Sequence, residues 1–254
     1  MSKVVTVRGT EIGAGAPKVI VPIVERSYSG IIGKVASFEG LPIDMVEWRA
    51  DFFDEIFDTE RVLYTLSGLR CALENTPLLF TMRTKSEGGD KEIAWDAYTA
   101  LNKAVARSGK ADLVDVEVFA GDGVAAENID IAHRAGCLVV GSNHDFRATP
   151  PAQELVSRLR KIQDMGADIA KIAVMPTCTA DVLALLSATA EMYENYAQCP
   201  LITMSMSAKG VISRLSGEVF GSAATFGSVG KGSAPGQIPV EQLAQALEIL
   251  HGAL

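Results

Sequence analysis

The sequence predicts an α/β fold, specifically a (β/α)8 TIM barrel, and three observations lead to this prediction. The chain has 254 residues, about the length that one such barrel takes. Short apolar runs alternate with helical patterns, as in right-handed βαβ units around a parallel sheet. Eight such runs are present, and eight units at this length favour a closed barrel over a doubly wound sheet. No long linker divides the chain, so we expect residues 1–254 to form one domain.

The expected elements follow one another in a regular order. Residues 4–16 are predicted to form a β-hairpin. The eight strands are expected at residues 18–24, 45–50, 77–83, 113–118, 137–143, 169–175, 201–206 and 222–227. Apolar residues at helical spacing predict helices over residues 59–74, 152–165, 179–197 and 239–251. Proline cannot donate to a strand ladder, so pairing of the first strand is expected to end at Pro22. In a barrel, the functional residues are expected at the carboxyl ends of the strands.

Composition restricts the classes of function. Charged residues make up 21% of the chain and the net charge is −8, without a basic stripe, which argues against disorder and nucleic-acid binding. No apolar run approaches membrane-spanning length, and no signal peptide is evident, so we expect a cytoplasmic protein without a membrane partner. The cysteines show no metal-binding spacing, so we expect free thiols and no metal or cofactor; they are Cys71, Cys137, Cys178 and Cys199.

Lys171 stands in the middle of the apolar strand at residues 169–175. A buried, unpaired ammonium is costly, and burial favours the neutral amine, which is the form that attacks a carbonyl. We therefore predict that Lys171 lines a pocket and forms a Schiff base. The alternative is a lysine on an edge strand, or one whose ammonium reaches water.

The ends of other strands carry further charged groups. Glu47 and Arg49 are two residues apart on one strand, so they share a face and need each other or a polar ligand. Arg83 ends the third strand. His144 ends the fifth strand, beside the strand of Lys171, and the ordinary pKa of histidine suits proton transfer near neutral pH.

The later strands add an apolar wall and another cation. Met204 and Met206 share a face of the seventh strand, and Arg214 follows in the next helix or loop. A glycine-rich segment comes after the eighth strand; it matches a phosphate loop only superficially, and we interpret residues 230–238 as a lid over the active site. Asp115 and Glu117 share a face of the fourth strand, where they can support Arg49 or Lys171.

Together these groups indicate a cofactor-independent lyase that acts on a small anionic ketone. A Schiff base on Lys171 would acidify the carbon next to the original carbonyl. His144 would then remove a proton and later return one. The three arginines suit a carboxylate on the substrate because a guanidinium binds a carboxylate through two parallel hydrogen bonds.

The motifs that hold these residues resemble those of the type I 3-dehydroquinate dehydratases, a family of the shikimate pathway. They occur in the family's order along nearly the whole chain, at residues 47–49, 80–83 with 87–89, 142–146, 171–175, 204–206, 210–214 and 233–237. The resemblance implies a (β/α)8 barrel closed at the bottom by the N-terminal hairpin, and a homodimer. Pro22 departs from the family pattern, which often has serine there, so we assign it no contact with substrate.

The resemblance also implies a role for each site residue. Lys171 would form an imine with the C3 ketone of 3-dehydroquinate. His144 would take the C2 proton and protonate the departing C1 hydroxyl, a syn elimination of water that gives 3-dehydroshikimate. Glu87 would orient His144 and tune its charge, and Arg214 would bind the carboxylate. The hydroxyls and ring would be held by Glu47, Arg49, Arg83, Ser233 and Gln237, with Met204 and Phe226 packed on the carbocycle.

Two other functions stay open on the sequence alone. Another Schiff-base barrel lyase, such as an aldolase, would be expected to have a phosphate site, and the sequence offers no convincing one. A barrel that binds without catalysis would be expected to lack Lys171 or His144, and both are present.

Overall fold

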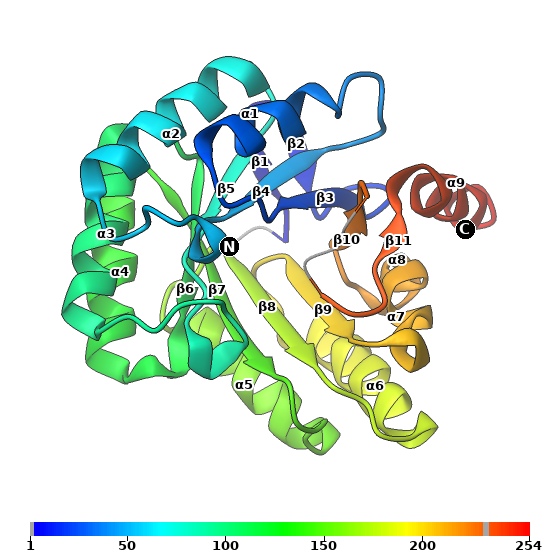
Figure 1. Cartoon of the computed structure of the whole chain (residues 1–254). Helices are drawn as coiled ribbons and strands as arrows, with labels where there is room; N and C mark the ends of the chain where they lie inside the picture. The colour runs from blue at the N-terminus through cyan, green and yellow to red at the C-terminus, as the bar shows by residue number, and fades with distance from the viewer. Residues whose placement is uncertain (1–2, 231–233) are drawn as a thin grey trace.

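The structure, a computed structural model, describes residues 3–230 and 234–254 (Figure 1). Its main sheet is parallel throughout, in the order β11-β10-β3-β4-β5-β6-β7-β8-β9. These strands are β3 (Lys18–Ile23), β4 (Met45–Arg49), β5 (Leu78–Thr81), β6 (Leu113–Glu117), β7 (Leu138–Asp145), β8 (Ile169–Val174), β9 (Leu201–Ser205), β10 (Ala224–Ser228) and β11 (Ile238–Pro239). A bridge between Leu201 and Ser222 joins β9 to the segment before β10. The sheet therefore curls into the predicted barrel.

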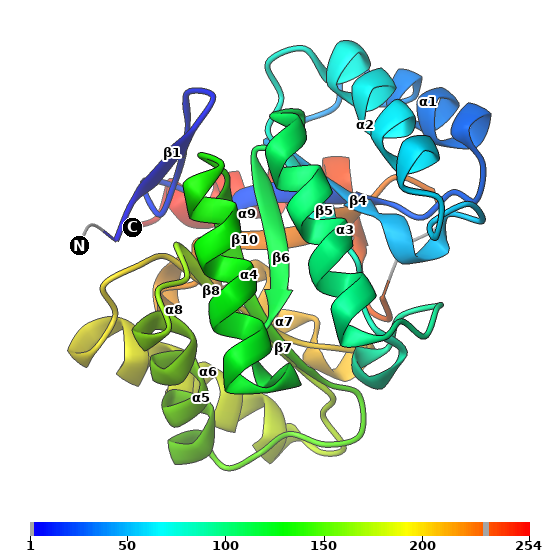
Figure 2. The same ribbon diagram turned by 90° about the vertical axis from the view of Figure 1, so that its left-hand side faces the viewer.

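Helices surround the sheet and connect its strands. They are α1 (Tyr28–Ala36), α2 (Thr59–Leu73), α3 (Trp95–Ser108), α4 (Asp122–Arg134), α5 (Ala152–Asp164), α6 (Thr179–Asn195), α7 (Ile212–Leu215), α8 (Gly217–Phe220) and α9 (Val240–His251). Short 3-10 turns are η1 (Ala50–Phe52), η2 (Lys85–Glu87), η3 (Val118–Ala120) and η4 (Ala208–Gly210). Figure 2 shows α3 and α4 covering β6 from outside. Within the described ranges, every helix is too short or too polar to cross a membrane.

The expectation for Pro22 was wrong on one side of the strand. β3 continues through Pro22 and stays paired with β4 as far as Ile23. Toward β10, pairing ends at Ile20. The N–H of Lys18 donates to the carbonyl of Ala223, on the β10 side. Alternate residues of a strand direct their N–H groups toward the same neighbouring strand, so the backbone nitrogen of Pro22 also faces β10. The missing N–H of Pro22 therefore faces the side where the ladder has already ended.

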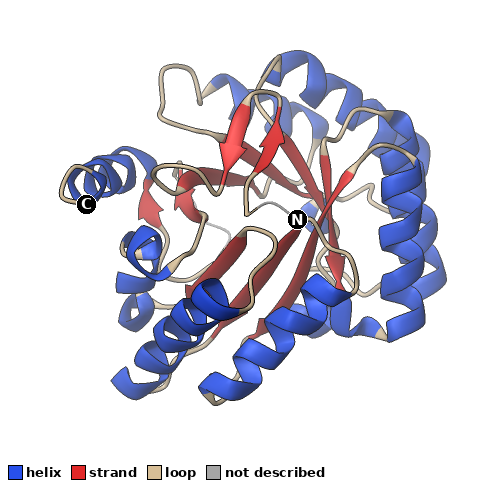
Figure 3. Ribbon diagram, turned by 180° about the vertical axis from the view of Figure 1, so that it is seen from behind, coloured by secondary structure: helices blue, strands red, loops and turns tan. Residues whose placement is uncertain are grey.

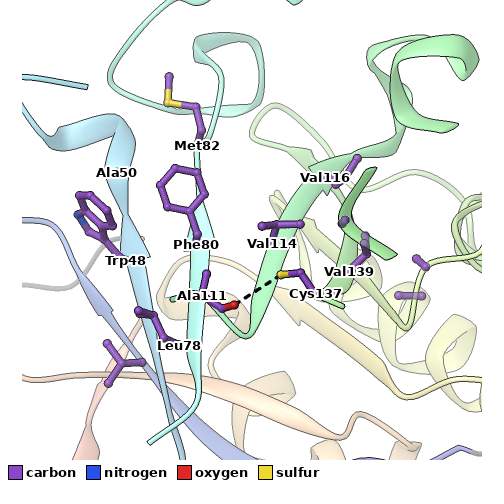
Figure 4. Packing of buried hydrophobic residues seen from close by; sticks show 14 of the residues in the cluster. Trp48, Ala50, Leu78, Phe80, Met82, Ala111, Val114, Val116, Cys137 and Val139 are labelled. Carbon is purple, nitrogen blue, oxygen red and sulfur yellow. Dashed lines mark hydrogen bonds between the residues drawn. The ribbon is translucent and has the colours of Figure 1, made fainter. Parts of the chain in front are cut away.

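Alternate residues of each strand pack into two separate apolar regions. Outward residues such as Trp48 and Phe80 join the larger core between strands and helices, where their ring centroids lie 5.5 Å apart (Figure 4). Inward residues near the strand starts form a second cluster inside the barrel, including Met45, Leu79 and Ile169. Further along the inward faces of β4, β6 and β8, charged side chains replace apolar ones, whereas β9 and β10 stay apolar. The barrel therefore has an apolar floor beneath an upper interior that is charged on one side and apolar on the other.

The predicted N-terminal hairpin closes this floor. β1 (Val5–Val7) and β2 (Thr10–Ile12) pair antiparallel, and Figure 3 shows them lying across one end of the barrel. Arg8 and Gly9 have φ values of 48° and 85°, as a type I′ turn requires. Val7 and Ile12 are buried in the interior cluster. The apolar side chains of the hairpin thus close the end of the barrel where the strands begin, and they exclude water from its interior.

Replacing Ile12 with alanine should destabilise the fold by about 2–5 kcal/mol, because the side chain is fully buried and its loss leaves a cavity. Urea denaturation followed by circular dichroism measures this change. Glu11→Ala is the matched control, since Glu11 is exposed on the same strand. Equal effects of the two substitutions would show that the hairpin does not plug the barrel.

Candidate active site

A cavity lies at the carboxyl ends of the barrel strands. It brings together most of the site residues predicted from the sequence, together with side chains that the sequence did not assign. The lining residues are Glu47, Arg49, Arg83, Glu87, Gly88, His144, Phe146, Lys171, Ala173, Met204, Met206, Phe226, Ala234 and Gln237. Ser233 lies outside the described residues, as does part of the segment 230–238 that was expected to form a lid.

Lys171 lines this cavity and is only 4% exposed. Its Nζ is 3.5 Å from Glu47 Oε1 and 3.5 Å from Asp115 Oδ2. It also lies 4.7 Å from the ring centroid of Phe226. Strands pair with β8 on both sides, so the alternative of an edge-strand lysine is excluded. Two carboxylates compensate the buried ammonium, and the nitrogen faces the space where a ligand fits.

His144 lies on β7, the strand next to Lys171, as the sequence predicts. Its Nδ1 is 2.9 Å from Glu87 Oε2, and the same oxygen accepts a hydrogen bond from the His144 backbone N–H at 2.9 Å. The other oxygen of Glu87 accepts one from Asn143 Nδ2 at 3.1 Å. Glu87 therefore holds the imidazole through Nδ1, which leaves Nε2 as the nitrogen for chemistry.

Burial and nearby charges shift the pKa values of both His144 and Glu87. Burial lowers the pKa of His144 well below its usual value, and the cations of Arg83, Lys171 and Arg49 act in the same direction. Burial raises the pKa of Glu87 to about 8, although Arg83 opposes the rise. When the pair gains a proton, Glu87 is therefore protonated and His144 remains a neutral imidazole. The neutral ring carries its hydrogen on Nδ1 when Glu87 is ionised. When Glu87 is protonated and donates to Nδ1, the ring hydrogen is on Nε2 instead.

Arg83 is held by carboxylates beneath the cavity. Its guanidinium lies 2.7 Å from Asp115 Oδ2, 3.0 Å from Glu117 Oε1 and 3.5 Å from Glu87 Oε2. Although burial opposes the charge, these carboxylates raise the pKa of Arg83 well above its usual value. Burial also works against ionisation of Asp115, but Arg83 and Lys171 hold its pKa below the usual value. Asp115 thus links Lys171 to Arg83, while Glu117 supports Arg83 and the Thr84 backbone.

Arg49 and Glu47 do not pair with each other. Arg49 forms a bidentate ion pair with Asp51, in which Nε and Nη2 each lie 2.8 Å from a carboxylate oxygen. Glu47 instead accepts a hydrogen bond from Thr81 at 2.9 Å and faces Lys171. The sequence analysis did not identify Asp51 as the partner of Arg49, although its position two residues later could have indicated it.

Arg214 is a buried cation that has no carboxylate partner among the described residues. It is fully buried in α7, and no carboxylate of the described residues lies within ion-pair distance. Its Nη2 donates to the Pro235 carbonyl at 3.2 Å, its Nη1 lies 3.9 Å from Met204 Sδ, and its Nε has no hydrogen-bond partner in the described ranges. Burial lowers the pKa of Arg214 to about 10. A guanidinium in this state is suited to binding an anion.

The comparisons with known proteins agree with this geometry. Residues 19–253 match the model of the type I 3-dehydroquinase family. The chain belongs to that family. It is 50% identical over 251 residues to a 3-dehydroquinate dehydratase of Bacillus licheniformis, covering 99% of each chain, and 49% identical to one of Salmonella agona, covering 99% of this chain and all of the relative.

Solved structures of type I 3-dehydroquinases superimpose closely on this chain. The enzyme of Clostridium difficile, solved with covalently modified comenic acid, has a TM-score of 0.97 at 47% identity and full coverage of both chains. The 3-dehydroquinate dehydratase of Geobacillus kaustophilus has a TM-score of 0.94 at 39% identity, covering 98% of this chain and 97% of its own. Membership of the type I 3-dehydroquinase family therefore rests on the whole barrel rather than on isolated motifs.

Lowering the pH through about 8 should move the ring hydrogen of His144 from Nδ1 to Nε2, because the added proton settles on Glu87. Nitrogen-15 NMR distinguishes the two neutral tautomers from the imidazolium, and a His144→Asn variant assigns the signals. An imidazolium that forms at pH 6.5 or above would contradict this reading of the pair.

Proposed function

We propose that this protein is a 3-dehydroquinate dehydratase that eliminates water from 3-dehydroquinate through an imine on Lys171. The observation that carries the proposal is the juxtaposition of Lys171 and His144 on neighbouring strands, inside a cavity that also contains cations. Family membership names the reaction. The proposal assigns the work to the chain's own residues, without a cofactor or a metal.

Arg214 binds the substrate carboxylate, because it is buried and has no anionic partner among the described residues. Glu47, Arg49 and Arg83 hold the ring and its hydroxyls, and they do so from fixed positions because each already has protein partners. Gln237, which lines the mouth, and Ser233 complete the polar contacts. Met204 and Phe226 pack against the carbocycle.

The first half of the reaction makes an electron sink. The neutral amine of Lys171 adds to the C3 carbonyl, and water leaves to give a protonated imine. Glu47 and Asp115, each 3.5 Å from Nζ, are placed to take the ammonium proton and to balance the positive charge of the imine. The apolar floor excludes water, which strengthens these interactions.

The second half is an elimination by one acid–base pair. His144 Nε2 removes the C2 proton, and the imine accepts the electron pair as an enamine. As Nε2 gains its proton, Nδ1 can release one to Glu87 across 2.9 Å. The reverse transfer protonates the C1 hydroxyl, which leaves as water. Hydrolysis of the imine then releases 3-dehydroshikimate and restores Lys171. Because one residue handles both protons, they are exchanged on the same face, as syn elimination requires.

The proposal extends to the organisation of the protein. Residues 1–254 act as one domain, in the cytoplasm, as a homodimer. Exposed apolar side chains on neighbouring helices support self-association, namely Leu183, Ile212, Val219 and Ile249. Size-exclusion chromatography with light scattering measures the assembly directly.

Borohydride added with 3-dehydroquinate should inactivate the enzyme and attach one substrate-derived mass to Lys171, because reduction traps the imine. Peptide mapping by mass spectrometry locates the adduct, and ultraviolet absorbance of the conjugated enone follows the product. Lys171→Ala should neither be labelled nor turn over substrate. Full activity in that variant would exclude covalent catalysis by Lys171.

His144→Ala is the control that separates binding from proton transfer. It should lose at least about 10²-fold in kcat, as expected for a general acid–base group. Labelling of Lys171 should persist, because imine formation does not need the C2 proton to move. An unchanged kcat would assign the proton transfer to another group.

Arg214→Met should weaken substrate binding strongly while leaving the free energy of unfolding unchanged or higher. An unpaired buried charge contributes little to stability, and an apolar side chain of similar size avoids its desolvation cost. Urea denaturation and steady-state kinetics measure the two effects. Destabilisation with normal KM would mean that Arg214 is a structural residue instead.

A further inference from the structure

A chain of hydrogen bonds leads from the Glu87–His144 pair out through the barrel wall. Glu87 Oε1 accepts a hydrogen bond from Asn143 Nδ2 at 3.1 Å. Asn143 Oδ1 accepts one from Arg158 Nη1 at 3.0 Å. Arg158 belongs to α5, which packs outside β7 and β8 (Figure 1). Neither Asn143 nor Arg158 lines the cavity in the described ranges, and the hydrogen bond from Asn143 to Glu87 links them to the site.

Strand alternation produces this route. His144 faces into the barrel, so its neighbour Asn143 faces outward toward α5. Asn143 is only 8% exposed, and both ends of its amide are engaged by protein groups. Glu87 reaches both residues because its two oxygens divide between them: Oε2 holds His144, and Oε1 meets Asn143.

The chemistry of the three groups permits one arrangement of the amide. A guanidinium has only donors, so Arg158 must meet the carbonyl oxygen of Asn143. The amide nitrogen of Asn143 then points at Glu87, and it too can only donate. Glu87 Oε1 must therefore act as an acceptor.

Arg158 itself is held in place by partners on its other side. Its Nε and Nη2 lie 3.1 Å and 2.6 Å from Glu154 Oε1, one helical turn earlier. Its Cζ lies 5.9 Å from the ring centroid of Phe119. These contacts orient the guanidinium toward Asn143.

We propose that Arg158 is a positioning residue for the reaction: it fixes the orientation of the Asn143 amide, which keeps Glu87 a hydrogen-bond acceptor for His144. This inference rests on the proposed function, in which His144 is the acid–base group. Without Arg158, the amide can turn over and present its oxygen to Glu87. That arrangement favours a protonated Glu87 and so disfavours the form of His144 that removes the C2 proton.

The test compares pH profiles of kcat and kcat/KM in Arg158→Ala, Asn143→Ala and the double variant. In Arg158→Ala, the acidic limb should move to higher pH by about one unit, because a hydrogen bond to a charged group changes a pKa by roughly that amount. Activity below the limb should fall about tenfold, and it should approach the wild-type value at alkaline pH. KM should change little, and borohydride labelling of Lys171 should persist.

Non-additivity identifies the route. If Arg158 acts through the amide, the double variant should shift the limb no further than Asn143→Ala alone. Arg160→Ala is the matched control, since Arg160 lies on the same helix, stacked 4.7 Å from the ring centroid of Tyr196 and away from this route. Arg158→Lys keeps a cationic donor and should hold the limb near the wild-type position, which provides a second variant if alanine impairs folding.

An acidic limb in Arg158→Ala that coincides with the wild-type limb, with or without a uniform loss of rate, would overturn the proposal. Fully additive shifts in the double variant would overturn it as well. The proposed function stands or falls separately, on turnover and labelling by the wild-type enzyme, because this inference concerns only the difference between variants and wild type.

Discussion

The ammonium of Lys171, held between the carboxylates of Glu47 and Asp115, is the interaction on which the rest of the site depends. It lies at the level where the barrel interior changes from apolar to charged. Below it, the hairpin and the strand starts form a dry floor. Above it, several inward positions carry buried charged side chains, and these need partners because an unpaired charge would be too costly. A rigid, closed sheet makes this arrangement possible, since it fixes the distances between charges on different strands.

The three arginines near the cavity differ in how far the protein satisfies them. Arg83 and Arg49 already have carboxylate partners, so they act as fixed, oriented donors. Among the described residues, Arg214 meets a carbonyl and a thioether but no carboxylate. In the proposed reaction, this asymmetry directs the substrate carboxylate to Arg214. The carboxylate end and the imine end of the small ring would then both be held, with His144 facing the carbon between them. Gly236, with φ 80°, brings the segment after β10 against the Ser207 carbonyl, where a side chain would clash.

The sequence predicted the order of strands, the hairpin and the placement of Lys171 and His144, because period-two alternation and strand ends are local signals. The family resemblance supplied the individual roles, and these stay proposals. Other features depend on which side chains meet across the fold. Nothing local distinguishes Asp51 from Glu47 as the partner of Arg49, and the Asn143–Glu87 bond joins residues 56 positions apart. The effect of Pro22 was mispredicted because its backbone nitrogen faces β10, and pairing with β10 already ends at Ile20.

The most direct measurement of the central claim is a crystal structure of the enzyme after reduction of its complex with 3-dehydroquinate by borohydride. We expect a single bond from Lys171 Nζ to the former C3 carbon, the substrate carboxylate against the guanidinium of Arg214, and His144 Nε2 facing C2. Electron density for an adduct on another lysine, or a carboxylate bound away from Arg214, would contradict the account.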